Sequence, residues 1–237
     1  MKVLIIVPAY NEGENILKTS KAITDYREIS QLDLYLIVIN DGSTDNTEQI
    51  CSENNIPVIT LIENLGIGGA VQTGYKYALD NDFDIAIQFD GDGQHNVEFL
   101  IDLINPIISK EADMTIGSRF INPSKGDFLS SKARRIGIKV ISSFIYIISK
   151  KVYLDTTSGF RAINKAIIKK FAYDYPREYP EPITLAELTK MKYKIKEIPV
   201  KMNNREAGIS SIKAWKSVYY MINVLLSIIV IGTRRYK

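Results

Sequence analysis

Several residues and patterns are scarce in this sequence, and each scarcity excludes a class of protein. A single cysteine, Cys51, among 237 residues excludes an intramolecular disulfide framework and fits a reducing compartment. Thirty basic against 27 acidic residues leave a net charge of +3, which is too small to indicate a nucleic-acid partner. The apolar start is interrupted at Pro8, so we expect no signal peptide. The uncharged stretch 218–232 is shorter than the ~20 residues that cross a bilayer.

The first half of the chain alternates short strand signals with helical periodicity. Strands are predicted at 2–7, 34–39, 57–61, 85–89 and 113–117, all rich in Ile and Val and without polar alternation. Helices are predicted at 12–26, 44–54, 68–81 and 97–109, with Ser43 or Thr44 capping the second and Asn96 the fourth. This alternation predicts an α/β fold with a doubly wound, mostly parallel sheet flanked by helices.

The second half is less regular. An amphipathic helix with basic ends is predicted at 132–151, a loop at 155–161, helices at 164–173 and 182–191, and a strand at 193–200. A polar loop at 203–211 precedes a terminal apolar helix. We therefore expect one undivided domain over 1–212 and a C-terminal segment, 213–237, that associates with a membrane or with another chain.

The most informative stretch is Asp90-Gly91-Asp92-Gly93-Gln94-His95, which follows a buried strand. Two carboxylates one residue apart repel one another unless a cation lies between them. Mg²⁺ or Mn²⁺ is the natural partner for oxygen ligands and for phosphate. The alternative is an Asp-Gly loop that only turns the chain.

Polar motifs also follow the first two strands. Residues 8–12 read Pro-Ala-Tyr-Asn-Glu, and residues 40–47 begin with Asn-Asp-Gly-Ser. Ligands of doubly wound sheets bind at the carboxyl ends of the strands. We expect these two segments and Asp90–Gln94 to meet at one edge of the sheet.

Taken together and in this order, the three motifs resemble the signature of inverting family 2 glycosyltransferases of the GT-A fold. The later segments Gly117–Phe120, Thr157–Ala162 and Arg205–Ser211 resemble the polyprenyl-phosphate branch, which includes dolichol-phosphate mannose synthases and bacterial undecaprenyl-phosphate sugar transferases. The resemblance covers about residues 1–212 and implies transfer from a nucleoside-diphosphate sugar. The sequence does not identify the sugar, and for a bacterial chain we favour UDP-glucose or UDP-GlcNAc over GDP-mannose.

The resemblance also implies roles for individual residues. A divalent Mg²⁺ or Mn²⁺ would be held by Asp90, Asp92 and Gln94. The nucleotide sugar would contact Pro8, Tyr10, Glu12, Asp41, Gly68, Gln72, Asp90 and Arg205, although a glycine cluster at 68–69 is equally expected where a helix packs closely. The acceptor phosphate would contact Arg119, Arg134 and Arg135. The residues implied in catalysis are Asp92, Asp155, Arg119 and Arg134.

Two of these residues have competing explanations. Asp155 is the best candidate for a carboxylate near the acceptor, but it could equally cap the turn that follows it. His95 is the only histidine, and we expect it to make a structural hydrogen bond rather than to act in catalysis. The segment 179–182, Tyr-Pro-Glu-Pro, resembles one in bacterial members of the branch that brings Glu181 to the sugar.

A polyprenyl phosphate is embedded in lipid, so the resemblance implies a membrane surface as a partner and the cytoplasmic face of the cell membrane as the location. The basic amphipathic segment 132–151 and the terminal segment would contact that surface. A homo-oligomer or a membrane-protein partner is also possible, and no nucleic acid is expected. The alternatives are a family 2 enzyme that extends a saccharide acceptor in wall or capsule synthesis, and a non-catalytic protein that binds sugar nucleotides.

Overall fold

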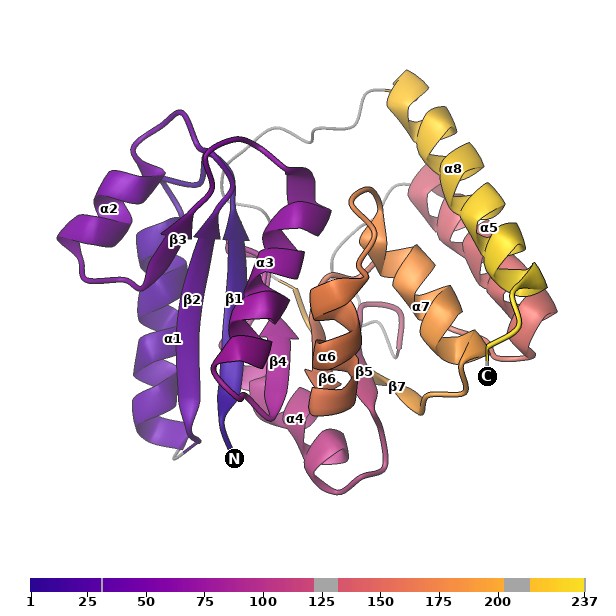
Figure 1. Cartoon of the computed structure of the whole chain (residues 1–237), viewed down its shortest axis with the longest axis horizontal. Coiled ribbons are helices and arrows are strands. Elements are labelled where there is room, and N and C mark those ends of the chain that lie inside the picture. The colour runs from indigo at the N-terminus through magenta and orange to yellow at the C-terminus, as the bar shows by residue number, and fades with distance from the viewer. Residues whose placement is uncertain (31, 122–131, 203–213, 237) are drawn as a thin grey trace.

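The computed structural model describes residues 1–30, 32–121, 132–202 and 214–236 (Figure 1). Its strands are β1 (Val3–Ala9), β2 (Leu34–Asn40), β3 (Val58–Thr60), β4 (Ile85–Gln88), β5 (Met114–Ser118), β6 (Arg161–Asn164) and β7 (Ile195–Pro199). Its helices are α1 (Ile16–Ser30), α2 (Thr47–Glu53), α3 (Gly66–Asp80), α4 (Leu100–Ile108), α5 (Lys132–Ser149), α6 (Lys165–Tyr173), α7 (Pro180–Lys190) and α8 (Ala214–Thr233), with a short 3₁₀ turn, η1 (Val97–Phe99), before α4.

The strands form one seven-stranded sheet in the order β3-β2-β1-β4-β6-β5-β7. The strand pairs are parallel except for those made by β6, which runs antiparallel to both β4 and β5. The predicted α/β class with a mostly parallel, helix-flanked sheet is therefore confirmed. The carboxyl ends of β1, β2 and β4 come together, as the rule for parallel sheets requires.

Two apolar layers enclose the sheet. On one face, α1, α2 and α4 contribute Ile23, Cys51 and Leu103 to a core with the inward side chains of the strands. On the other face, α3 and α6 pack on the sheet, and α5, α7 and α8 extend this second core outward (Figure 1). Strands buried on both faces explain why β1 and β4 are apolar at nearly every position.

Helices α5 and α8 lie side by side at the edge of the molecule and run parallel (Figure 1). A side chain at Gly137 would touch Met221, and one at Gly232 would collide with Ile148, so small residues permit the close contact. The C-terminal helix thus packs on the rest of the chain through α5 and α7. The predicted boundary between 1–212 and 213–237 stays a prediction, and the loop 203–211 lies outside the described residues.

Two elements correct the sequence-based expectations. The second helix begins at Thr47 and not at residue 44, because Ser43 and Thr44 bond to Asn11 in place of capping it. The predicted loop 155–161 and helix from residue 164 leave out β6, a four-residue strand between β4 and β5. The expected cap is present at Asn96, whose side chain accepts from the backbone N–H of Glu98.

Candidate active site

A cavity of about 620 Å³ lies at the carboxyl ends of β1, β2 and β4. Its walls contain six of the predicted residues, namely Pro8, Tyr10, Glu12, Asp41, Asp90 and Asp92. The remaining lining residues are Ala9, Asn64, Gly66, Ile67, Gly91, Thr157, Gly159 and Glu181. The sequence motifs that follow three different strands therefore share one hollow.

The two loops after β1 and β2 are tied together by hydrogen bonds. The side chain of Asn11 accepts from the backbone N–H of Thr44 at 2.8 Å, and Ser43 accepts from the backbone N–H of Asn11 at 2.9 Å. Thr47 accepts from the backbone N–H of Glu12 at 3.0 Å. These bonds fix the wall of the cavity that carries Tyr10 and Glu12.

Asp41 lies at the floor of the cavity and is 3% exposed. Its Oδ1 accepts a hydrogen bond of 2.7 Å from the backbone N–H of Leu65, at the start of α3. Burial raises the pKa of Asp41, and the hydrogen bonds from Leu65 and Gly66 oppose that rise. A buried acceptor in this position can receive a hydrogen bond from a ribose hydroxyl or a base N–H.

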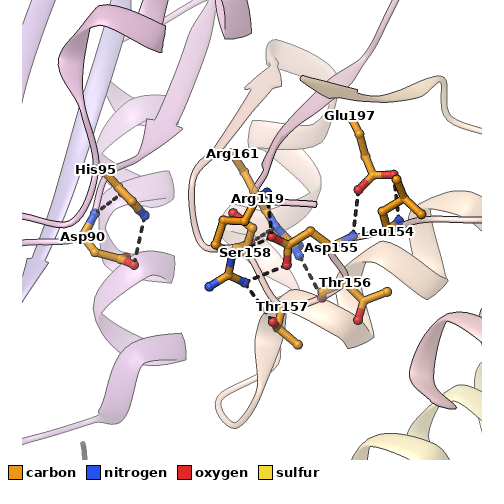
Figure 2. Close-up of polar contacts among 10 residues, drawn as sticks. All are labelled: Asp90, His95, Arg119, Leu154, Asp155, Thr156, Thr157, Ser158, Arg161 and Glu197. Carbon is orange, nitrogen blue, oxygen red and sulfur yellow. Dashed lines mark hydrogen bonds and ion pairs between the residues drawn. The ribbon is translucent and has the colours of Figure 1, made fainter. Parts of the chain in front are cut away.

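Asp90 is held in place by the lone histidine (Figure 2). Nδ1 of His95 accepts a 3.0 Å hydrogen bond from the backbone N–H of Asp90, so the imidazole carries its proton on Nε2. Nε2 lies 3.4 Å from Oδ2 of Asp90. The imidazole stacks on Phe160 with a centroid separation of 4.6 Å. Burial lowers the pKa of His95 to about 4, so the ring is neutral near pH 7. The expected structural role of His95 matches this geometry.

The second carboxylate, Asp92, is nearly buried and accepts from the backbone N–H of Gln94 at 3.1 Å. Gln94 thus acts on Asp92 through its main chain, and its side chain is not among those that line the cavity. Gly159 approaches from the opposite side, where an added Cβ would lie 3.0 Å from Oδ2 of Asp90. A larger residue at this position would require the side chains of Asp90 and Gln88 to shift.

Arg119 and Asp155 form a buried ion pair beside the cavity (Figure 2). Nε and Nη2 of Arg119 each donate to a different oxygen of Asp155 at 2.7 Å, and the backbone N–H of Arg119 donates at 3.1 Å. Nη2 also donates to Oγ1 of Thr157 at 3.2 Å. Because Thr157 lines the cavity, the guanidinium is one hydrogen bond away from it.

The segment that carries Asp155 and Thr157 is anchored from two sides. Glu197, on β7, accepts from the backbone N–H groups of Leu154 and Asp155 at 2.8 Å each. The buried guanidinium of Arg161 donates to the carbonyls of Ser158 and Thr156 at 2.7 and 3.3 Å (Figure 2). The segment is therefore held rigidly between the two halves of the site.

Glu181 enters the cavity from the first turn of α7. Burial raises its pKa, the charge of Asp90 adds to that rise, and the nearby charge of Arg161 opposes it. Nη1 of Arg161 donates at 2.8 Å to the main-chain carbonyl of Glu181. The sequence placed Glu181 near the site only through a family resemblance, whereas the structure places it among the residues that line the cavity.

Gly68 and Gln72, which were predicted to contact the nucleotide sugar, are not among the residues that line the cavity. The backbone N–H of Gly68 donates to the carbonyl of Arg177, and an added Cβ would collide with the carbonyl of Pro176, so this glycine permits close packing of α3. Gln72 donates to the carbonyls of Phe171 and Ala172, which joins α3 to α6. Arg205 lies outside the described residues.

The basic residues of α5 divide between two places. Desolvation lowers the pKa of Arg134, and the charge of Arg119 lowers it further. The two guanidinium groups are therefore close enough to interact. Arg135 lines a second hollow, beside Phe120. Arg119 and Arg134 therefore concentrate positive charge beside the cavity, next to the carboxylate of Asp155.

Comparisons with known proteins agree with this geometry. Residues 4–173 match the family model described as glycosyl transferase family 2. The chain is 30% identical over 220 residues to the UDP-N-acetylglucosamine–dolichyl-phosphate N-acetylglucosaminyltransferase of Methanococcus voltae, with 84% of each chain covered. It is 28% identical to the undecaprenyl-phosphate mannosyltransferase of Micrococcus luteus, covering 89% of this chain and 87% of the other.

A solved structure shares the fold. The glucosyl-3-phosphoglycerate synthase of Mycobacterium tuberculosis, in complex with Mn²⁺, uridine diphosphate and phosphoglyceric acid, superposes with a TM-score of 0.74. The two sequences are 15% identical, and the match covers all of this chain and 80% of the other.

Proposed function

The chain belongs to glycosyl transferase family 2, and we propose that it moves a sugar from a nucleoside diphosphate to a polyprenyl phosphate. The observation that carries the proposal is the hydrogen bond between Arg119 and Thr157, which joins the guanidinium of Arg119, with Arg134 near it, to the wall of the cavity. A donor in the cavity and a phosphate at Arg119 would then be neighbours. Relatives named for lipid-phosphate acceptors support this choice of acceptor.

The nucleotide would occupy the wall formed by Tyr10, Glu12 and Asp41. Tyr10 is 48% exposed and presents a flat ring to the cavity, on which a base could stack. Asp41 would accept from the ribose or the base. The bound diphosphate would then lie toward Asp90 and Asp92, at the end of β4.

The residues at the end of β4 fit a hard divalent cation. Asp90 and Asp92 both line the cavity, and the charge of Asp90 already raises the pKa of Glu181, so like charges are crowded there. Within the described residues no group of three or more His, Cys, Asp or Glu side chains could hold a metal. Asp90 and Asp92 would hold Mg²⁺ or Mn²⁺ together with oxygens of the diphosphate. Such an ion would neutralise charge that develops on the leaving diphosphate.

The acceptor phosphate would attack the anomeric carbon from the face opposite the diphosphate. A bond forms between a phosphate oxygen and that carbon, and the bond to the diphosphate breaks with its electrons on the leaving oxygen, which inverts the carbon. A phosphate monoester is ionised near pH 7 and requires no general base. Arg134, which is exposed, would bind it in the bidentate manner of guanidinium groups. Arg119, whose Nε and Nη2 are engaged by Asp155 and Thr157, would contribute positive charge that helps to orient it.

Asp155 would act in this reaction by positioning Arg119. Both of its oxygens are engaged by that residue, and its side chain is fully buried. Glu181 would accept hydrogen bonds from sugar hydroxyls opposite Asp90. The two relatives are named for transfer of different sugars, one for N-acetylglucosamine and the other for mannose. We favour a UDP sugar, and the identity of the sugar is decided by the assay.

A lipid acceptor requires contact with a membrane, and α5 and α8 provide a suitable face. None of the described helices is long and apolar enough to cross a bilayer. The exposed apolar side chains of α8 lie on one side of the helix, at Tyr219, Ile222, Leu226 and the adjacent pair Ile229 and Val230. On α5, Ile136 and Ile147 are exposed together with basic residues such as Lys139. This pattern is typical of helices that lie in the interface of an anionic leaflet, here proposed as the cytoplasmic one.

The test is transfer of radiolabelled sugar from UDP-glucose, UDP-GlcNAc and GDP-mannose to undecaprenyl phosphate in vesicles with Mn²⁺ or Mg²⁺. We expect one donor to label the lipid, with activity lost on chelation and in the variants Asp92→Ala and Arg119→Ala. Asp25→Ala, an exposed change on α1, serves as the control and should stay active. Binding of the nucleotide without labelling of the lipid would refute the acceptor and direct attention to saccharides.

A further inference from the structure

A second hollow, distinct from the donor cavity, lies between α5 and the segment that leads into Asp155. Its volume is about 390 Å³, and it is walled mainly by apolar side chains. We call it the α5 groove and define it by Phe120, Ile138, Val152, Tyr153 and Leu154, with Arg135 and Lys139 at its polar side. The proposed reaction as described above leaves this groove without a role.

The groove is built into the fold. Ile138 and Tyr153 are 4% and 6% exposed and form its base. Ser142, on α5, donates a 2.6 Å hydrogen bond to the carbonyl of Tyr153, and Glu197 accepts from the backbone N–H of Leu154. The segment 152–154 is therefore fixed to α5 on one side and to β7 on the other. Val152 and Leu154, by contrast, are 63% and 47% exposed, an unusual placement for two aliphatic side chains so near each other.

The groove begins where the Arg119–Asp155 pair ends. Leu154 directly precedes Asp155, and Phe120 directly follows Arg119, whose guanidinium carbon lies 5.6 Å from the centre of the Phe120 ring. Arg135 lines the groove and adds positive charge on the same side. An anionic head group at Arg119 would thus be continuous with an apolar trough of limited length.

We propose that the α5 groove binds the isoprene units of the acceptor lipid that lie next to its phosphate. This inference rests on the proposed function and adds a binding site to it. A charged head at the ion pair and a branched hydrocarbon in the groove match the two parts of a polyprenyl phosphate. The remaining chain then continues into the bilayer, while the groove selects acceptors that carry at least a short isoprenoid.

The groove predicts that acceptor affinity depends on the first few isoprene units. Each buried methylene raises affinity about fourfold, so even partial burial of one five-carbon unit gives a tenfold preference or more. We expect the KM for farnesyl phosphate to be at least tenfold lower than that for isopentenyl phosphate, in detergent-free solution without vesicles. The kcat should change little, because the phosphate is held in the same place.

The variants Val152→Asp and Leu154→Asp place a carboxylate at the exposed wall of the groove. We expect each to raise the KM for farnesyl phosphate about tenfold, with smaller effects on isopentenyl phosphate and none on nucleotide affinity. Ile29→Asp makes the same chemical change at a residue of α1 that is 77% exposed, and should leave both acceptors unaffected. Direct titration of farnesyl phosphate into each protein gives the same comparison without turnover, and thermal unfolding shows whether the variants stay folded.

Several outcomes would overturn the inference. If the wild-type protein uses farnesyl phosphate and isopentenyl phosphate equally well, the transferase assignment stands but the α5 groove does not bind the acceptor lipid. The same holds if the groove variants bind farnesyl phosphate normally, or if they change only the oligomeric state in solution, which would make the groove a contact between protein chains. Transfer to no lipid phosphate of any length, in solution or in vesicles, would refute the proposed function and the groove together.

Discussion

Replacing Asp155 with asparagine removes one charge of a buried pair and leaves the other in place. The Arg119 and Asp155 side chains are 7% and 0% exposed, and two hydrogen bonds of 2.7 Å join them. Asparagine keeps the shape but presents an NH₂ group to one of the two guanidinium donors. Loss of one partner from a buried ion pair costs about 3–5 kcal/mol, because the remaining charge stays desolvated.

Urea denaturation measures this effect. With a denaturant slope of about 3 kcal/mol per molar, Asp155→Asn should lower the midpoint by about 1–1.7 M. The double variant Arg119→Met with Asp155→Leu removes both charges and fills the space with apolar atoms, so we expect it to recover most of the loss. A midpoint within about 0.3 M of wild type for Asp155→Asn would refute the reasoning, since the pair would then contribute almost nothing.

The same variants separate stability from chemistry. The double variant should be stably folded and should bind the nucleotide, because the cavity walls at Asp41 and Asp90 are unchanged. It should nevertheless fail to transfer sugar, since the guanidinium that orients the acceptor is gone. Normal transfer by this variant would show that Arg119 serves the fold alone.

Three further predictions address single residues. Gly159→Ala would place a Cβ 2.9 Å from Nε2 of Gln88 and 3.0 Å from Oδ2 of Asp90, so we expect Mn²⁺ affinity, measured by electron paramagnetic resonance, to fall about tenfold, or 1.4 kcal/mol. Gly68→Ala would collide with the carbonyl of Pro176, so thermal unfolding should show a loss of about 1–3 kcal/mol, with nucleotide affinity retained. His95→Phe keeps a ring against Phe160 but removes the acceptor for the backbone N–H of Asp90, which should destabilise the protein by about 1–3 kcal/mol.

The histidine also predicts a pH dependence in chelator-treated protein. The folded-state pKa of His95, about 4, lies below the ordinary value of 6.5, so the unfolded chain binds more protons between these values. This contribution to stability is complete above pH 6.5 and is lost as pH falls toward 4, by about 3 kcal/mol. Carboxylates titrate in the same range, so the quantity to compare is the difference between wild type and His95→Phe. An identical pH profile for the two proteins would contradict the assignment.

A control variant and two contrary results test the predictions for the glycine variants. Gly137→Ala adds the same methyl group on α5, where it would make an ordinary contact of 3.4 Å with Met221, and it should leave metal affinity unchanged. If Gly159→Ala binds Mn²⁺ as wild type does, Asp90 either moves aside freely or does not hold the ion. If Gly68→Ala loses nucleotide affinity without losing stability, this glycine contacts the nucleotide after all, as the family resemblance implies.

The edge of the sheet that carries the cavity could be predicted from the sequence, because its signals are local. Strands β1, β2 and β4 are apolar at nearly every position, and polar motifs follow each of them directly. Topology then brings Tyr10, Asp41 and Asp90 together without further information. The contacts that complete the site are of another kind.

Long-range pairings could not be predicted in this way. Arg119 and Asp155 are 36 residues apart, and each suits a different role when read alone. Strand β6 has only four residues and begins with a buried charge, Arg161, whose partners are carbonyls of the preceding segment and groups of α7. A short strand with a charged first residue gives no periodic signal. The glycine at 68 shows the same limit, since spacing alone does not distinguish a ligand contact from a close helix contact.

The placement of β6 has a consequence for where the sheet can open locally. Strands β4 and β5 do not pair directly, so four residues of β6 join one half of the sheet to the other. Residues 155–160 lead straight into that seam, and the amide of Gly117 is bonded to the carbonyl of Phe160. We therefore expect exchange of the Gly117 amide with deuterated solvent to require separation of β5 from β6. The segment that holds Asp155 and Thr157 is thus tied at its end to the strand that joins the two halves of the sheet.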